Sequence, residues 1–133
     1  GTCVASDQEK GGIKCGRNST NGEILIIKAR KASDGSEATL ALQSLPTGDG
    51  RTDVKIYWKD ITNPESYSSP KNFAENWNQQ PYQVSYTGSA YSTMTLQKDG
   101  RIGFFYEEEP GWYSMVYVPI SVEAITDGLY SVK

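Results

Sequence analysis

Ser-Ala-Tyr-Ser-Thr-Met-Thr-Leu-Gln-Lys-Asp-Gly-Arg-Ile-Gly-Phe-Phe-Tyr-Glu, residues 89–107, consists of two apolar and β-branched runs on either side of an Asp-Gly pair. An Asp-Gly pair between two such runs predicts a β-hairpin, because a type I′ turn needs two central residues that accept positive φ. A turn centred on Asp99-Gly100 sets Ser92 opposite Glu107. Tyr91 and Glu107 are therefore expected at the same open end of this hairpin.

Short runs of the same kind occur on both sides of the hairpin. They lie at Glu23–Ala29, Ala38–Gln43, Thr52–Trp58, Tyr82–Tyr86 and Tyr113–Ile120, with turns predicted at Ser33–Gly35 and Pro46–Gly50. Pro119 indicates a strand end or an edge position. The segment 69–77 predicts one helical turn with Ser69 as N-cap and Pro70 in the first position, although a loop with a buried aromatic fits nearly as well.

The pattern as a whole is typical of an all-β protein. About eight short strands are separated by turns every roughly 8 to 15 residues, which predicts antiparallel meanders. Residues 1–21 are polar, rich in Gly and Lys and without either period, so we expect an irregular lead-in there.

Composition excludes several classes of function. The 133 residues suit one small domain, and 13 Lys and Arg against 16 Asp and Glu give a net charge of −3 without a basic block. We therefore expect neither nucleic-acid binding nor a membrane span. The chain has no histidine, which excludes Ser-His-Asp and Cys-His machinery within it, and no cofactor or metal is expected.

Two cysteines leave an alternative open. Cys3 and Cys15 form either a short disulfide loop in an oxidising compartment or two unrelated thiols, and their spacing matches no metal motif.

The stretch SAYSTMTLQKDGRIGFFYEE resembles the C-terminal signature of the sialidases (neuraminidases). In that signature an Ala- or Gly-Tyr-Ser strand, an Asp-Gly turn and an Ile-Gly-x-x-Tyr-Glu strand follow in this order. The resemblance implies a six-bladed β-propeller, of which residues 22–133 would form about the last two blades. No intact Asp-box turn, which many sialidases repeat, is present in the sequence.

The resemblance also assigns roles to three residues. Tyr91 takes the place of the catalytic nucleophile of a retaining glycosidase. Arg51, in the passage Gly48–Ile56, takes the place of one of three arginines that hold the substrate carboxylate. Glu107 takes the place of the glutamate that orients the first arginine of that triad.

The family's general-acid Asp, the Glu that serves as base and the other two arginines have no counterpart here. The resemblance therefore implies that the chain is the C-terminal part of an exo-sialidase, inactive by itself, which acts on sialylated glycans when further blades or another chain complete it. An extracellular or periplasmic location follows only from where sialoglycans occur. The alternative is a non-catalytic sugar-binding or interaction module, in which Trp58, Trp77 and Trp112 could stack on sugar rings if exposed, although a tryptophan is more often a core residue.

Overall fold

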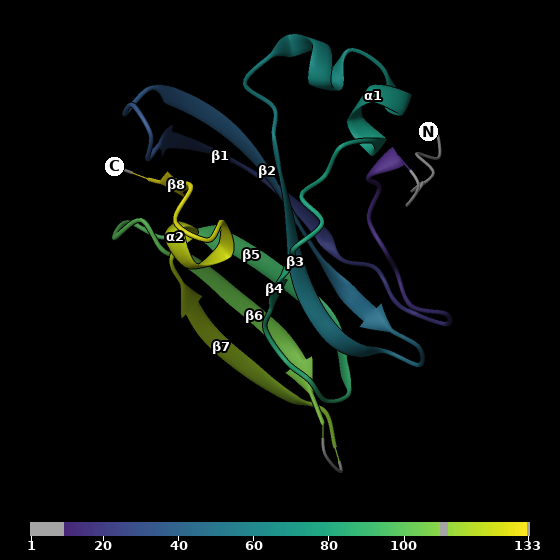
Figure 1. Ribbon diagram of the computed structural model, residues 1–133. Coiled ribbons are helices and arrows are strands. Elements are labelled where there is room, and N and C mark those ends of the chain that lie inside the picture. Colours follow the sequence, from purple (N-terminus) through teal and green to yellow (C-terminus); the bar gives the residue numbers. More distant parts are fainter. Residues whose placement is uncertain (1–9, 110–111, 133) are drawn as a thin grey trace.

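The structure of the chain is a computed structural model, and it describes residues 10–109 and 112–132 (Figure 1). Almost all of its regular structure is antiparallel sheet, so the predicted all-β class is confirmed. The strands of the described part are β1 (Glu23–Lys31), β2 (Glu37–Gly48), β3 (Thr52–Asp60), β4 (Tyr82–Gln83), β5 (Ser89–Leu96), β6 (Ile102–Glu108), β7 (Ser114–Ile120) and β8 (Tyr130–Ser131). The helices are η2 (Pro64–Tyr67), α1 (Pro70–Ala74) and α2 (Val122–Ile125).

The strands form two sheets. One has the order β4-β3-β2-β1-β8 and the other β5-β6-β7. A shared core lies between them, with Leu42 and Ile56 from the first sheet and Ile102 and Phe104 from the second, all fully buried. The alternation of apolar and polar residues along each strand sends one face of each sheet into this core. The structure shows two open sheets, and it does not show the blade arrangement that the resemblance implies.

A second apolar cluster lies on the other face of the five-stranded sheet. It contains Tyr57 and Trp77 and is closed by the segment around α1. The expected helical turn is confirmed, and Ser69 caps α1 by accepting a hydrogen bond from the Asn72 N–H. Trp58 and Trp77 are 8% and 4% exposed, so they are core residues and are not available to stack on sugar rings. Both fill apolar clusters, as large aromatic side chains of a small domain usually do.

A buried lysine fastens α1 to β3. Lys59 Nζ donates hydrogen bonds to the carbonyl oxygens of Asn72, Phe73 and Glu75, at the C-terminal end of the helix. The carbonyls there lack partners within the helix, so the ammonium group satisfies them. Burial lowers the pKa of Lys59 below its ordinary value. The role of this charge is therefore structural.

The C-terminal segment returns to the first sheet. Tyr130 pairs with Lys31 at the edge of β1, and its hydroxyl donates a hydrogen bond to the Asp60 carboxylate on β3. Thr126, fully buried, donates to the Val122 carbonyl and accepts from the Tyr130 N–H. These bonds attach the α2–β8 segment to the end of the first sheet (Figure 1).

The central hairpin is confirmed, but its predicted turn and register are wrong. Leu96 pairs with Ile102, and the Gln97 N–H donates to the Arg101 carbonyl, which leaves the three residues 98–100 in the loop. The Gly100 N–H donates back to the Gln97 carbonyl, and φ of Gly100 is 87°. A turn followed by one left-handed residue is the usual three-residue hairpin loop. Ser92 consequently pairs with Tyr106 instead of Glu107.

The turn before β3 also differs from the prediction. Pro46 lies within β2, paired with Val54, and the turn occupies residues 49–51. Proline fits there because the pairing of β1 with β2 ends at Ser44, so no strand needs an N–H from Pro46 on that side, where its carbonyl accepts hydrogen bonds from Ser19 and Gly16.

Replacing Gly100 with alanine is expected to destabilise the protein by about 1 kcal/mol, because only the backbone conformation opposes a side chain there. A Cβ at this position would meet Val132 at ordinary contact distances, the shortest 3.6 Å. Urea unfolding measures the change. Gly100→Asn is the matched control and should cost less, since asparagine tolerates positive φ. Equal costs for both variants would contradict the left-handed loop residue.

Candidate functional site

The structure brings together the three residues that the sequence singled out. The Tyr91 side chain is 52% exposed on β5. The Arg51 guanidinium carbon lies 5.7 Å from the centroid of its ring, within the range of a cation–π contact. The Tyr91 N–H donates to Glu107 Oε2 on β6 at 3.4 Å. One tyrosine, one arginine and one carboxylate from separate segments therefore meet at one end of the two sheets.

A β-bulge places Tyr91. Ser89 pairs with Glu108 and Ser92 with Tyr106, so Ala90 and Tyr91 together oppose the single residue Glu107. Ala90 is buried while the next residue, Tyr91, points to solvent. Bulges are common beside functional sites because the extra residue re-aims a side chain. The three-residue loop already sets Tyr91 opposite Glu107, and the bulge shares that place between Ala90 and Tyr91.

Polar contacts on the buried side of β5 hold the strand next to the bulge. The Ser92 hydroxyl is 2.8 Å from the hydroxyl of Ser44 on β2, and this pair joins the two sheets directly below the exposed face. Ser44 is fully buried and also accepts a hydrogen bond from the Glu23 N–H. On the next strand the Tyr106 hydroxyl donates to the Glu108 carboxylate. Burial, followed by this contact with Glu108, raises the pKa of Tyr106 to about 12.

The backbone of Arg51 is held by hydrogen bonds between the turn at residues 49–51 and the start of β5; this set of contacts is called the seam below. Its carbonyl accepts a hydrogen bond of 2.8 Å from the Ser89 N–H, and Thr52 forms an isolated bridge with Gly88. The Ser89 hydroxyl in turn accepts from the Val54 N–H. Ser89 is two residues before Tyr91, so the same backbone segment carries the tyrosine and fixes the arginine.

The backbone of the turn is unusual. The φ angle is 66° at Arg51 and 58° at Asp53. These are left-handed values, which residues other than glycine, asparagine and aspartate rarely adopt. Such values persist where surrounding contacts impose them, and they gather at functional sites. Sequence reasoning missed Asp53, whose only visible signal is an acidic residue two positions after Arg51.

The chemistry of the cluster is that of an anion site with an available phenol. Arginine presents a planar pair of donors suited to a carboxylate. No side chain among the described residues hydrogen-bonds the Tyr91 hydroxyl, so the phenol is free to meet a ligand. A phenol attacks as a nucleophile only when a base takes its proton. Glu107 contacts the Tyr91 backbone, so the groups brought together here include no base for that hydroxyl.

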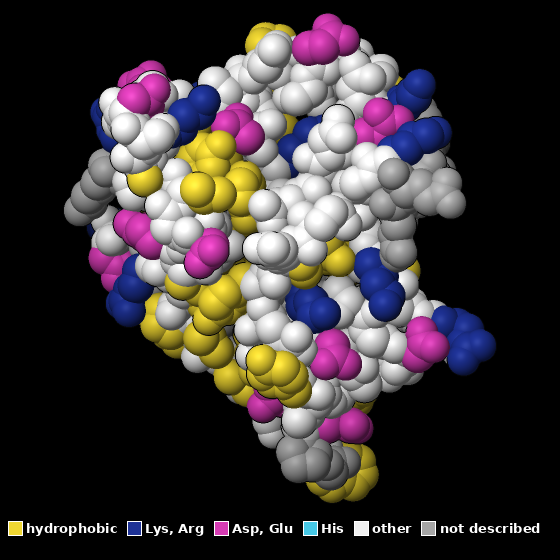
Figure 2. Space-filling model, in the orientation of Figure 1, with side chains coloured by type: hydrophobic (Ala, Val, Ile, Leu, Met, Phe, Trp, Pro, Cys, Tyr) yellow, Lys and Arg dark blue, Asp and Glu magenta, His cyan; other side chains and the backbone are white. Residues whose placement is uncertain are grey.

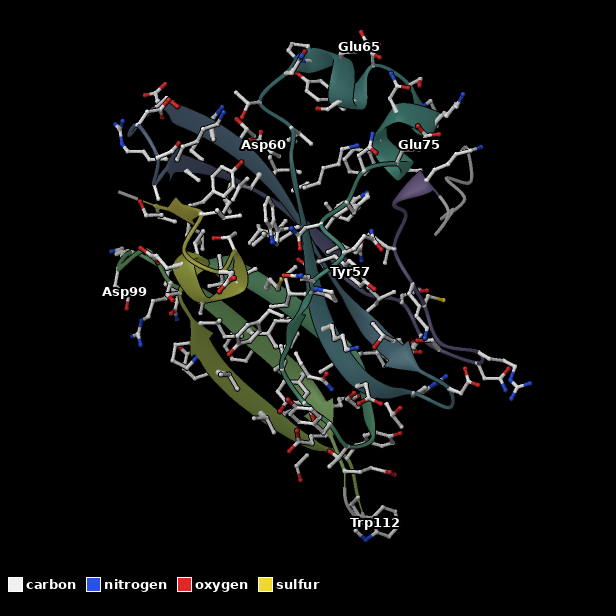
Figure 3. The ribbon with its side chains drawn as sticks, viewed as in Figure 1. Tyr57, Asp60, Glu65, Glu75, Asp99 and Trp112 are labelled. Carbon is white, nitrogen blue, oxygen red and sulfur yellow. The ribbon has the colours of Figure 1, made fainter. Side chains whose placement is uncertain are left out.

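Of the three tryptophans, Trp112 alone is exposed, at 89%. It projects at the far tip of the loop between β6 and β7 (Figure 3). Tyr86, before β5, is also largely exposed. A separate polar hollow near α1 is lined by acidic and amide side chains, among them Asp60, Glu65 and Glu75 (Figure 3).

Neither a metal centre nor a membrane helix is found in the part of the chain that the structure describes. Within residues 10–109 and 112–132, no three His, Cys, Asp or Glu side chains are grouped so that they could hold a metal ion. None of the helices there has the length and apolar character needed to cross a membrane. Cys15 is exposed, and Cys3, with any disulfide between the two, lies outside the described residues.

No protein-family model matches the chain, and no curated protein matches it significantly.

Proposed function

We propose that this chain is the C-terminal part of a retaining exo-sialidase, in which Tyr91 is the nucleophile and Arg51 binds the carboxylate of the sugar. The convergence of Arg51, Tyr91 and Glu107 is the single observation that supports this function most. A sequence motif alone points to each of the three residues, and they come from separate segments of the chain.

The chemistry of the substrate explains why a tyrosine suits this role. Sialic acid carries a carboxylate on its anomeric carbon, so a carboxylate nucleophile would approach against like charge. A phenol avoids this repulsion, and sialidases differ from other retaining glycosidases in using tyrosine. An arginine next to the phenol can hold the sugar's carboxylate bidentately while the phenolic oxygen attacks the anomeric carbon. Glu107, whose carboxylate accepts a hydrogen bond from the Tyr91 N–H, is available to orient a further arginine.

The proposal includes a partner that completes the site. The general acid, the base and two arginines must come from further blades of a propeller or from another chain. Two open apolar faces support such packing. Phe105 and Tyr117 stack with centroids 4.9 Å apart on the outer face of the three-stranded sheet, and Ile24 and Ile26 are exposed on the outer face of the other. Figure 2 shows hydrophobic side chains gathered over β7.

Fluorophore release from a fluorogenic α-sialoside tests the function. The complete protein, whether a longer chain or an assembly, is expected to release fluorophore, and the 133-residue chain alone is not. Tyr91→Phe in the complete protein should abolish turnover, because the attacking oxygen is gone, while Arg51→Lys should raise KM. Glu107→Gln should also weaken substrate binding. Unchanged turnover in Tyr91→Phe would reject the proposal. The location that fits this function is extracellular or periplasmic, where sialoglycans occur.

The exposure of Trp112 favours a second candidate, a non-catalytic carbohydrate-binding or interaction module. An exposed indole offers an apolar face on which a sugar ring can stack. Glycan binding that survives Tyr91→Phe, needs no sialic acid and disappears in Trp112→Ala would support this module over the enzyme.

A further inference from the structure

We infer that Asp53 is the positioning residue that holds Arg51 over the Tyr91 ring. The inference rests on the proposed function only for the meaning of that contact. The positioning of Arg51 itself depends on the hydrogen bonds of one carboxylate.

The Asp53 carboxylate ties the turn to two neighbouring segments. Its Oδ2 accepts a hydrogen bond of 2.7 Å from the Thr52 hydroxyl, and its Oδ1 accepts one of 2.9 Å from the Gln83 side-chain amide. The same Gln83 amide also donates to the Ser85 carbonyl, on the segment that leads into β5. One side chain therefore connects the residue after Arg51 with the chain that approaches Tyr91.

The backbone of Asp53 completes the seam. Its N–H donates to the Thr87 carbonyl at 3.2 Å, and its carbonyl accepts from the Thr47 hydroxyl at 2.9 Å. With the Arg51–Ser89 bond, these contacts fix a turn whose left-handed φ values would otherwise be unfavourable at residues other than glycine. Glycine would suit this backbone better, so the aspartate contributes through its carboxylate.

Gly48, on the opposite strand, leaves the space that this carboxylate needs. A Cβ on Gly48 would lie within 2.0 Å of the Thr52 hydroxyl oxygen and 2.6 Å of Asp53 Oδ2. The φ of Gly48 is not in the left-handed region, so its lack of a side chain serves packing instead of backbone freedom. Two positions on facing strands thus control the same hydrogen bond.

The test compares two variants that act on the carboxylate from opposite sides. Asp53→Gly removes the carboxylate and keeps a backbone that accepts positive φ, while Gly48→Ala displaces the Asp53–Thr52 contact. Asp49→Asn is the matched control, because Asp49 lies in the same turn, is exposed and contacts Arg17 instead. Proton NMR of each folded chain measures the nuclear Overhauser effect between the Arg51 side chain and the Tyr91 ring, and thermal unfolding is followed in parallel.

The Arg51–Tyr91 contact is expected to be lost in both variants and kept in Asp49→Asn. Asp53→Gly should change the unfolding temperature only slightly, because relief of the left-handed backbone offsets much of the cost of the lost hydrogen bonds, and loss of the contact in a protein of nearly unchanged stability separates positioning from a merely structural role. Persistence of the contact in either variant, or its loss in Asp49→Asn, overturns the inference. In the complete protein, affinity for N-acetylneuraminic acid should fall at least about tenfold in Asp53→Gly, as a misplaced group does. A lost NMR contact in a protein that never binds sialic acid would uphold the positioning and reject the proposed function.

Discussion

Truncation of Phe104 to alanine is expected to destabilise the protein by about 3 to 5 kcal/mol. The Phe104 ring is fully buried between the sheets, with its centroid 5.6 Å from that of Tyr106. Its removal costs the transfer energy of the ring and leaves a cavity that two packed sheets cannot close. Such a loss is a large part of the roughly 5 to 15 kcal/mol that stabilises a typical domain. Urea unfolding followed by tryptophan fluorescence measures it.

Phe105 provides the matched control for this prediction. It is the next residue on β6, points to the other face of the sheet and is 37% exposed. Phe105→Ala should cost the isolated chain less than about 1.5 kcal/mol, the size of its aromatic contact with Tyr117. Equal losses for the two variants would contradict the orientation of β6. A much larger cost of Phe105→Ala in the complete protein would indicate that another sheet covers this face.

The second large effect is a loss of stability in alkali. The pKa of Tyr106 is raised to about 12, first by burial and then by its hydrogen bond to Glu108, while an unfolded tyrosine titrates near 10. Above pH 10 the unfolded chain therefore releases a proton that the folded chain keeps. The stabilisation is complete below pH 10 and is lost as pH rises to 12, which amounts to about 3 kcal/mol for two pKa units.

Comparison with Tyr106→Phe isolates this contribution. The variant lacks the ionising group, so its stability should fall about 3 kcal/mol less than that of the parent between pH 10 and 12. Lys59 has a lowered pKa, so its burial becomes less unfavourable as pH rises, but this effect is the same in both proteins and cancels. Tyr130, whose pKa burial also raises, makes a parallel contribution in both. Urea unfolding at several pH values measures the difference, and parallel curves would contradict it.

The strands could be predicted from sequence because their signals are local. Alternating apolar residues located β1, β3 and β5–β7, and Ser69-Pro70 located the start of α1. The loop length of the central hairpin could not be predicted, since Asp-Gly suits both a two-residue turn and a three-residue loop. The bulge at Ala90–Tyr91 has no local signal either, because it depends on how β5 meets the first sheet.

The candidate site, too, has a part that could be predicted from local sequence and a part that could not. A motif named Arg51, Tyr91 and Glu107, but the contact between the first two depends on the seam from Arg51 to Ser89, which joins segments distant in sequence. Sequence alone does not tell which tryptophan is exposed: Trp77 is buried and Trp112 is exposed, because burial depends on what covers a residue and not on its type. The assignment of roles to the three residues stays a prediction.

The pairing of β8 with β1 has a consequence for how the protein is made. Lys31 pairs with Tyr130, about 100 residues later in the chain. At a synthesis rate of about 5 to 20 residues per second, the Arg30–Lys31 end of β1 waits roughly 5 to 20 seconds for its partner. An unpaired strand edge can bind a strand of another chain during that time. Arg30 and Lys31 carry positive charge at this edge, and like charges on neighbouring nascent chains would keep such edges apart until the last strand arrives.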